Sequence, residues 1–348
     1  MKTYHEASDR FRLQPLTEAN ENWTELLKAT SHATLYHRES WIELLRRAYG
    51  LSLSLATLCR DGAVVAGCVL ARSPIPFQKR FISLPFSDSC APLAVDEETA
   101  RELLGAIARQ SDTSTVYEIR GISARSPWAT LDNYRAWELD LHRPLSEISN
   151  GLALNFRRNL REACRETIKV EHGKELDYVR RFYELHLRSR RRLGLPSQPW
   201  RFFKLTQEIF AREGALDVFV ASRNSLDLAS AVFLRCDSTV YYKWGARRPE
   251  GRSRANHLLF WNAIEEFCTH SRTLDLGRTD IRNEGLSRFK RELGGVQALL
   301  PYSFYPKPPN SVSSEALTGP RGIIAKIWTQ LPLPLTRVVG GAIYRFLA

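Results

Sequence analysis

Arginine side chains are concentrated in one turn of the sequence, between a predicted strand at 240–245 and a predicted helix at 257–267. Arg247, Arg248, Arg252 and Arg254 all lie in this turn. A basic loop that leads into a helix amino terminus combines side-chain charge with unpaired backbone N–H donors. Such a loop favours the phosphates of a pyrophosphate or a nucleic acid. We therefore expect an anion to bind here and any chemistry to take place beside it.

The strand before this turn is rich in aromatic residues. In an unbroken strand, side chains alternate between the two faces, which puts Tyr242 and Trp244 on one face and Tyr241 and Lys243 on the other. One face must belong to the core, and for Tyr241 we favour an ordinary core position. Tyr242 and Lys243 are candidates for contact with a bound ligand.

Charge is unevenly distributed along the chain. Residues 1–150 carry 17 Lys and Arg against 19 Asp and Glu, a net charge of −2, whereas the whole chain carries +12, so residues 151–348 carry +14. Most of this excess is arginine, which is the better residue for bidentate phosphate contacts. An anionic ligand or partner is therefore expected for the second half.

Length and composition indicate an ordinary globular protein of more than one domain. A chain of 348 residues exceeds one typical core, and 43% hydrophobic with 25% charged residues does not suggest disorder. The six cysteines are scattered without a CxxC pair, which favours reduced core residues in a cytoplasmic protein. Neither an apolar leader nor a membrane-spanning stretch is visible, and no set of metal ligands is visible near His257, so no metal is expected. A lone histidine at a helix start is more often a capping or packing residue.

An internal duplication is visible in the pattern of elements. Residues 65–72 can be laid over residues 228–235, and each is the second arm of a strand–turn–strand unit. Two helical patterns precede each unit, and a strand, a helix and another strand follow it. Such a repeat predicts tandem domains of one fold.

The order of these elements, ending in a helix with Phe289, Lys290, Gly294 and Gly295, resembles the GNAT acyltransferase fold. Two such domains in tandem, with a basic helix leading into the second, resemble the FemAB-like family of peptidyl and acyl transferases. Within it, the chain is most similar to FemAB-like proteins associated with exopolysaccharide and PEP-CTERM protein-sorting systems. The segments that carry the resemblance are 154–161, 190–196, 256–261, 275–279 and 285–290.

The resemblance implies an α/β (α+β) fold of two tandem GNAT-like domains, each a mixed sheet flanked by helices. We expect an N-terminal GNAT-like domain at 1–150 and an acyltransferase domain with a leading basic helix at 151–306. A linker and an amphipathic tail are expected at 307–348.

The resemblance also implies roles for single residues. The strand at 240–245 is expected to part from its parallel neighbour, so that backbone N–H groups can hold the acyl carbonyl as an oxyanion hole. Lys290 is placed near the donor phosphate or the reacting carbonyl, as an electrostatic stabiliser. Tyr242 or Asp275 assists proton movement, although Asp275 and Asp280 can instead simply pair with Arg278, which is the favoured reading. Further binding candidates are Lys243, Arg252, Arg254, Asn256, Gly277, Arg278 and Phe289.

Two more basic clusters lie on predicted helices. Arg157, Arg161 and Arg165 share one helix face, which is either a solvated surface or the edge of a substrate groove. A second cluster, at 188–192, ends a long helix, where cations complement the helix dipole. Arg188 is the member most favoured for substrate contact.

The predicted function is transfer of an acyl group from acyl-CoA, or of an aminoacyl group, to an amine of a cell-envelope or exopolysaccharide precursor. One alternative is a Fem-type peptidyltransferase that takes its donor from aminoacyl-tRNA and acts on a peptidoglycan precursor. GNAT enzymes that use acyl-CoA usually have a glycine-richer turn here, whose backbone amides alone hold the pyrophosphate. This chain departs from that pattern, so either its arginine side chains take over this role or the donor is an aminoacyl-tRNA. An alternative of another class is a non-catalytic RNA- or anionic-glycan-binding protein.

The tail at 307–348 alternates apolar groups with Lys326, Arg337 and Arg345, and Pro332 and Pro334 interrupt it. This pattern suits either an interfacial segment at the inner face of the membrane or packing on the globular body. An interfacial segment would bring the enzyme to a lipid-linked acceptor.

Overall fold

A computed structural model describes residues 10–16, 20–75, 79–112, 114–248, 254–309 and 320–347. The contacts divide the chain into two units. Unit 1 contains the described residues up to Asn133 together with 300–309, and unit 2 contains Tyr134–Leu299 together with 320–347.

Unit 1 is a mixed sheet with helices. Its strands run in the order β1-β2-β3-β4-β6-β14, antiparallel except for the parallel pair β4 and β6. Two of its helices begin at capping side chains, since Asn20 accepts a hydrogen bond from the Trp23 N–H and Asp96 accepts one from the Thr99 N–H. The elements are β1 (Arg10–Pro15), α1 (Glu21–Ala29), η1 (Leu35–His37), α2 (Glu39–Tyr49), β2 (Leu53–Arg60), β3 (Ala63–Arg72), β4 (Arg80–Ile82), β5 (Leu93–Ala94), α3 (Glu97–Gln110) and β6 (Val116–Arg120).

Unit 2 has the same plan. Its strands run in the order β7-β12-β11-β10-β9-β8, and only β11 and β12 are parallel. The elements are β7 (Ala129–Asp140), α4 (Leu145–Gly151), α5 (Leu154–Arg165), β8 (Lys169–Gly173), α6 (Leu176–Arg192), α7 (Trp200–Arg212), β9 (Leu216–Arg223), β10 (Leu226–Cys236), β11 (Thr239–Arg247), α8 (Ala255–Phe267), β12 (Thr273–Asp275), β13 (Thr279–Asp280), α9 (Glu284–Glu292), β14 (Val296–Tyr305), α10 (Pro320–Gln330), α11 (Leu333–Ile343) and η3 (Tyr344–Leu347).

The two units repeat one topology, which confirms the predicted tandem GNAT-like architecture. In each, two helices lead into an antiparallel hairpin, β2–β3 or β9–β10, and a helix then connects two parallel strands. The matching parallel pairs are β4 with β6 and β11 with β12. The segments 65–72 and 228–235, which the sequence suggested as equivalent, fall on the equivalent strands β3 and β10.

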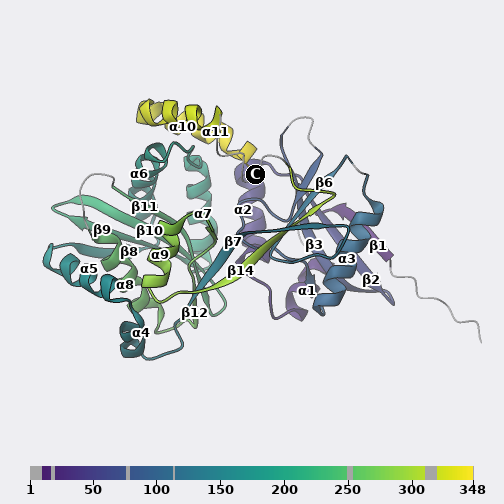
Figure 1. Ribbon diagram of the computed structural model, residues 1–348, viewed down its shortest axis with the longest axis horizontal. Coiled ribbons are helices and arrows are strands. Elements are labelled where there is room, and N and C mark those ends of the chain that lie inside the picture. The colour runs from purple at the N-terminus through teal and green to yellow at the C-terminus, as the bar shows by residue number, and fades with distance from the viewer. Residues whose placement is uncertain are drawn as a thin grey trace, which may run out of the picture. The chain divides into compact units, whose positions relative to one another are not determined.

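The core of unit 2 lies on both faces of its sheet (Figure 1). On one face, Phe260 and Phe267 of α8 pack against Phe233 of β10 at ring distances of 6.0 and 5.1 Å. On the other face, α6 and α7 cover β10 and β11, with Phe202 and Phe203 of α7 against Trp244. Strand β10 is buried along most of its length, as expected for a strand covered on both sides.

The units do not follow the predicted division at residues 150 and 306. The chain passes from unit 1 to unit 2 inside β7 and returns inside β14. The end of β7 pairs with β12, while the end of β14 pairs with β6. The tail helices α10 and α11 cluster with unit 2 through contacts to α6 (Figure 1).

Candidate active site

Strand β11 parts from its parallel neighbour, as the sequence predicted. Thr239, Val240 and Tyr241 pair with β12, but β12 ends at Asp275. The chain then turns at Gly277, whose φ of 75° is a backbone conformation that favours glycine. Strand β11 meanwhile stays paired with β10 as far as Arg247. A wedge therefore opens beside the second half of β11.

A β-bulge changes which residues of β11 face this wedge. The register shifts so that Trp244 lies opposite Val232 and Tyr242 lies opposite Phe233, which leaves Lys243 as the extra residue. Tyr242 therefore packs on Phe260 of α8, 4.9 Å between ring centres, whereas Trp244 packs on α7 at the other face. The prediction that Tyr242 and Trp244 share a face is wrong, because it assumed an unbroken strand.

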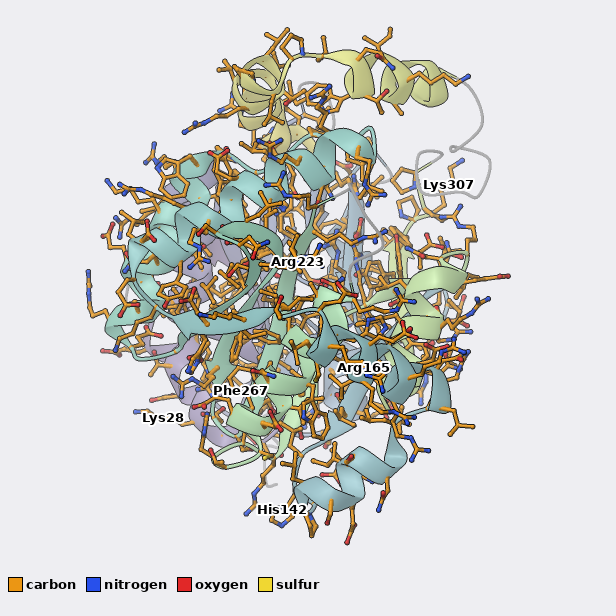
Figure 2. All side chains as sticks on the ribbon, turned by 90° about the vertical axis from the view of Figure 1, so that its left-hand side faces the viewer. Lys28, His142, Arg165, Arg223, Phe267 and Lys307 are labelled. Atoms are coloured by element: carbon orange, nitrogen blue, oxygen red, sulfur yellow. The ribbon has the colours of Figure 1, made fainter. Side chains whose placement is uncertain are left out.

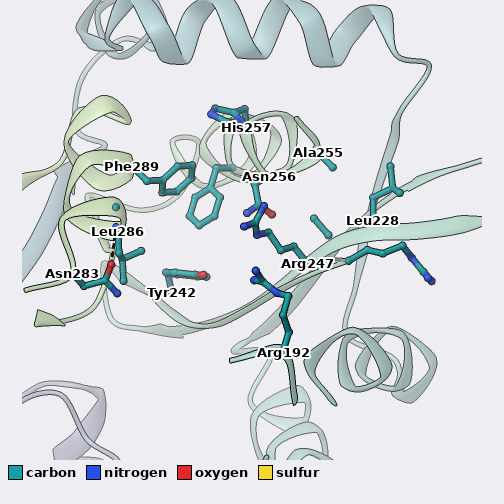
Figure 3. A pocket seen from close by; sticks show the side chains of 14 residues that line it. Arg192, Leu228, Tyr242, Arg247, Ala255, Asn256, His257, Asn283, Leu286 and Phe289 are labelled. Atoms are coloured by element: carbon teal, nitrogen blue, oxygen red, sulfur yellow. Dashed lines mark hydrogen bonds between the residues drawn. The ribbon is translucent and has the colours of Figure 1, made fainter. Parts of the chain in front are cut away.

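A pocket of about 520 Å³ fills the wedge (Figure 3). It is bounded by the end of α6, the start of β10, the second half of β11, the first turn of α8 and one face of α9. Figure 3 shows Arg192, Arg247, Asn256 and the ring of Tyr242 directed into the same space. The lining residues are Arg192, Leu228, Ala229, Tyr242, Arg247, Arg248, Ala255, Asn256, His257, Phe260, Asn283, Gly285, Leu286 and Phe289.

The pocket is positively charged. It is lined by three arginines, and none of the described residues that line it is acidic. Arg248 is fixed by a hydrogen bond from its Nε to the carbonyl of Asp227, at 2.9 Å. The guanidinium groups of Arg192 and Arg247 are exposed and form no ion pair within the described ranges. The first turn of α8 also points its dipole here, and its N-cap residue Arg254 makes no side-chain capping bond. The arrangement fits a ligand that carries phosphates.

The aromatic ring of Tyr242 forms the floor of the pocket. Its hydroxyl group is the one side-chain hydroxyl among the described residues that line the pocket. Burial raises the pKa of Tyr242 to about 12, so the hydroxyl stays protonated at neutral pH and can donate a proton. Its position depends on Gly245, because a Cβ atom at residue 245 would lie 1.9 Å from the Tyr242 Oη. Glycine therefore lets the tyrosine side chain lie along its own strand.

His257 is a packing residue, in agreement with the reading of the sequence. Its ring lies 4.8 Å from Phe156 and 5.7 Å from Phe289. The Asn159 Oδ1 accepts a 2.8 Å hydrogen bond from the Arg254 Nε, so the Asn159 Nδ2 faces the His257 Nε2, 3.2 Å away. The Nε2 atom must then be an acceptor. Burial lowers the pKa of His257, which agrees with a neutral imidazole.

The arginines predicted on helix α5 do not line the pocket. Arg157 is half-buried and Arg161 is exposed, and the Arg161 Nε donates to the Arg157 carbonyl at 3.3 Å. Arg254 also turns toward α5, where it forms a 2.8 Å ion pair with Glu162 in addition to its bond to Asn159. The structure thus uses Arg254 to join α5 to the start of α8.

The cluster at the end of α6 contributes a different arginine from the predicted one. Arg188 is exposed and lies outside the pocket, whereas Arg192, one helical turn later, lines it. Of the other predicted binding residues, Asn256 and Phe289 line the pocket and Lys243 does not. Arg252 lies outside the described residues.

Lys290 and its neighbours form a support outside the pocket. The Lys290 side chain is buried, and its Nζ donates to the carbonyls of Gly277 at 2.8 Å and of Arg278 at 3.2 Å. Asp275 accepts the Gly277 N–H at 2.6 Å, and the Arg278 guanidinium lies 4.6 Å over the Tyr134 ring. Asp280 binds Arg282. This geometry does not support Lys290 as a stabiliser of the reacting carbonyl or Asp275 as a proton acceptor. It ties α9 to the turn after β12 and so positions the α9 side chains that line the pocket.

We expect Lys290→Met to destabilise the protein by about 2–4 kcal/mol, because two buried carbonyls lose their charged donor. Urea denaturation compared with Lys169→Met, at an exposed lysine of β8, measures this effect. A variant with unchanged stability and a greatly reduced rate of acyl transfer would contradict the supporting role.

A second cavity, of about 350 Å³, lies on the other face of α9. It is lined by Arg135, Ile281, Glu284, Ser287, Arg288, Arg291 and Gln297, so three arginines face one glutamate. The two cavities together place anion-binding side chains on both sides of one helix.

Part of the chain that contains most of this pocket matches a known domain family. Residues 154–291 match the family model of the acetyltransferase (GNAT) domain. No curated protein sequence matches the chain.

Three solved structures illustrate the shared fold. The crystal structure of FemX superposes with a TM-score of 0.61 at 15% identity, covering 83% of this chain and 96% of that one. The C-terminal domain of a putative lysylphosphatidylglycerol synthetase from Agrobacterium fabrum gives 0.55 at 12% identity, covering 81% and 92%. A tandem GNAT protein from the clavulanic acid biosynthesis pathway gives 0.54 at 12% identity, covering 86% and 100%.

Residues 154–291 thus carry the match to a GNAT acetyltransferase domain. The chain as a whole shares the fold of FemX and of the tandem GNAT protein.

Proposed function

We propose that the protein transfers an acyl group from a phosphate-bearing donor, acyl-CoA, to an amine of a cell-envelope or exopolysaccharide precursor. The observation that carries this proposal is the arginine-lined pocket at the point where β11 leaves β12. Arg192 and Arg247 bind the donor phosphates at its mouth, and the aromatic floor of Tyr242, Phe260 and Phe289 holds the apolar part of the donor. Acyl-CoA is the donor that GNAT domains use.

In this proposal the acceptor amine attacks the thioester carbonyl directly. The C–N bond forms, the tetrahedral intermediate collapses and the C–S bond breaks, so the electron pair leaves on sulfur. Tyr242 is protonated at neutral pH and donates its proton to that sulfur, while the amine gives up its proton to solvent, from which Tyr242 is protonated again. Holding both reactants beside each other supplies much of the rate enhancement.

The acceptor is proposed to carry phosphates as well. The second cavity supports this view, because Arg135, Arg288 and Arg291 line it on the opposite face of α9. A precursor linked to a nucleotide or a lipid through phosphates has the matching charge. Such acceptors are made in the cytoplasm or at the inner face of the membrane, and we place the protein there.

An aminoacyl-tRNA is the second candidate donor. Among the described residues, three arginine side chains give the pocket its positive charge. Arginine side chains suit the extended phosphate backbone of a nucleic acid. Treatment of the reaction with RNase separates the two donors, since only a tRNA-dependent transfer would stop.

The proposal predicts that Arg247→Ala weakens binding of coenzyme A about 10- to 100-fold, the value of one charge-assisted hydrogen bond of about 1.5–3 kcal/mol. Isothermal titration calorimetry with acetyl-CoA measures it, and Arg192→Ala should act in the same direction.

The matched control is Arg212→Ala, at an exposed arginine of α7 outside the pocket. Equal affinities for Arg247→Ala, Arg192→Ala and the native chain would remove the assignment of the donor site. Salt-sensitive RNA binding without any acyl transfer would instead support a binding protein that retains the fold.

A further inference from the structure

The tail helices α10 and α11 attach to unit 2 through contacts with α6. Trp328 and Thr336 are buried. The contact is close, since a Cβ atom on Gly340 would lie 3.0 Å from the backbone of Ser197 and one on Gly194 would lie 2.7 Å from Ala325. The Arg191 Nε also donates to the carbonyl of Thr329 at 3.2 Å. The tail is therefore fixed on the end of α6 and the loop after it.

The opposite side of the tail exposes large apolar side chains. We call Ile327, Leu335 and Val338 the tail patch; they are 57%, 45% and 70% exposed. Figure 2 shows side chains of both helices extending away from the rest of unit 2. Exposed apolar groups gathered on one short segment indicate an interaction surface.

The charge of the tail limits the kind of partner. Residues 316–348 contain four basic side chains, Arg321, Lys326, Arg337 and Arg345, and no acidic one. Lys326 and Arg345 are exposed, whereas the Arg337 guanidinium turns back toward α6 and lies 5.5 Å from the centre of the Tyr183 ring. In a symmetric pair the same surface would face itself, and these cations would repel one another. An anionic partner matches the surface better than a second copy does.

The lengths of the two tail helices favour binding to the surface of a membrane over spanning it. Each tail helix has 11 residues, which gives about 17 Å, roughly half the hydrocarbon thickness of a bilayer. In the part of the chain that the structure describes, no helix is long and apolar enough to cross a membrane. Helices with an apolar outer side and basic neighbours suit the interface of a membrane that contains anionic lipids.

We propose that α10 and α11 form a binding surface for an anionic lipid bilayer. The tail patch enters the boundary between headgroups and acyl chains, while Lys326 and Arg345 contact the lipid phosphates. When this surface binds, the side of unit 2 that carries α6 and the tail faces the membrane. This inference does not depend on the proposed acyl transfer.

Co-sedimentation of the full chain with vesicles tests the proposal. We expect binding to vesicles of phosphatidylcholine with 30% phosphatidylglycerol, and binding at least 10-fold weaker to phosphatidylcholine alone or at high salt. The double variant L335E/V338E should lose at least 10-fold in affinity for the anionic vesicles. Both side chains are exposed, so the variant should keep the melting temperature of the native chain.

The matched control is Leu226→Glu, at a residue of unit 2 that is 45% exposed and lies outside the tail. It should bind the vesicles like the native chain. The proposal fails if the native chain binds vesicles with and without phosphatidylglycerol equally, or if the double variant binds the anionic vesicles as well as the control does. It also fails if sedimentation without lipid shows a dimer that the double variant abolishes, because a second copy would then cover the tail patch.

Discussion

Replacing Gly245 with alanine is expected to lower the rate of acyl transfer roughly 100-fold, the cost of displacing a group at a reacting centre by about 1 Å. The new Cβ would lie 1.9 Å from the Tyr242 Oη, 2.9 Å from Cζ and 3.3 Å from Cε2. The ring is held by Phe260 at 4.9 Å and Phe233 at 5.6 Å, so it can move only by giving up that packing or by entering the pocket. Measurement of kcat/KM and of the Kd for coenzyme A would show the loss.

A double-mutant cycle distinguishes this steric effect from a general loss of stability. In a Tyr242→Ala background the clash is gone, and Gly245→Ala should then cost little more. Gly151→Ala is the matched control, because a Cβ there meets no atom within 4 Å. Fully additive effects of the two substitutions would contradict the proposed contact.

The sequence predicted the elements around the site well, because they follow from local periodicity. The strand at 240–245 and the helix at 257–267 both appear in the structure. The parting of β11 from β12, which the resemblance to the GNAT fold implied, appears as well. The duplication was also visible, since equivalent hairpins have equivalent apolar patterns.

The directions of the side chains were less predictable, because they depend on events outside the segment itself. The bulge at Lys243 is set by the register with Val232 and Phe233 of β10, which alternation within β11 does not reveal. Lys290 was expected at the donor, but its ammonium is bound to carbonyls from a separate turn. Such partners are fixed only when the elements pack together.

The choice among arginines failed for a similar reason. The sequence of α6 does not reveal which turn of the helix approaches β11. The position of that turn determines that Arg192, and not Arg188, lines the pocket. Arg247 and Arg248 lay in the predicted basic turn, after the expected strand at 240–245, and were not among the residues assigned to phosphate contacts. In the structure β11 runs on to Arg247, which brings that side chain into the pocket.

Acidification should destabilise both units through buried histidines. Burial lowers the pKa of His37 to about 4 and that of His186 to about 3, from an ordinary value of 6.5. The unfolded chain therefore binds protons at a higher pH than the native one. The stabilisation is present above pH 6.5 and is lost as the pH falls toward the native pKa values. In that window each histidine should lower the free energy of unfolding by about 1.4 kcal/mol per pH unit, or by about 2–3 kcal/mol between pH 6.5 and 4.5.

The surroundings explain why these imidazoles resist protonation. His37 in unit 1 is bonded on both ring nitrogens, with the Thr34 N–H donating to Nδ1 at 3.0 Å and Nε2 facing the Ala91 carbonyl at 2.9 Å. A second proton would leave the Thr34 N–H facing another donor. His186 in unit 2 packs between Phe182 and Phe203, with Arg190 nearby as a further positive charge. The hydrogen bonds of His37 to Ala91 and of His186 to Gln198 raise these pKa values, but burial outweighs them and no acidic group is among the causes that favour the charged form.

His186→Gln tests this in unit 2, because glutamine keeps a neutral hydrogen-bonding group opposite Gln198, 2.8 Å from the native Nε2. Urea denaturation at several pH values between 6.5 and 4.5 should show a smaller loss of stability on acidification than in the native chain. His172→Gln is the matched control at an exposed histidine of the same unit and should keep the native pH dependence. If the stability of His186→Gln fell as steeply on acidification as that of the control, protonation of His186 would not be the cause. The loss of stability would then come from protonation of carboxylates.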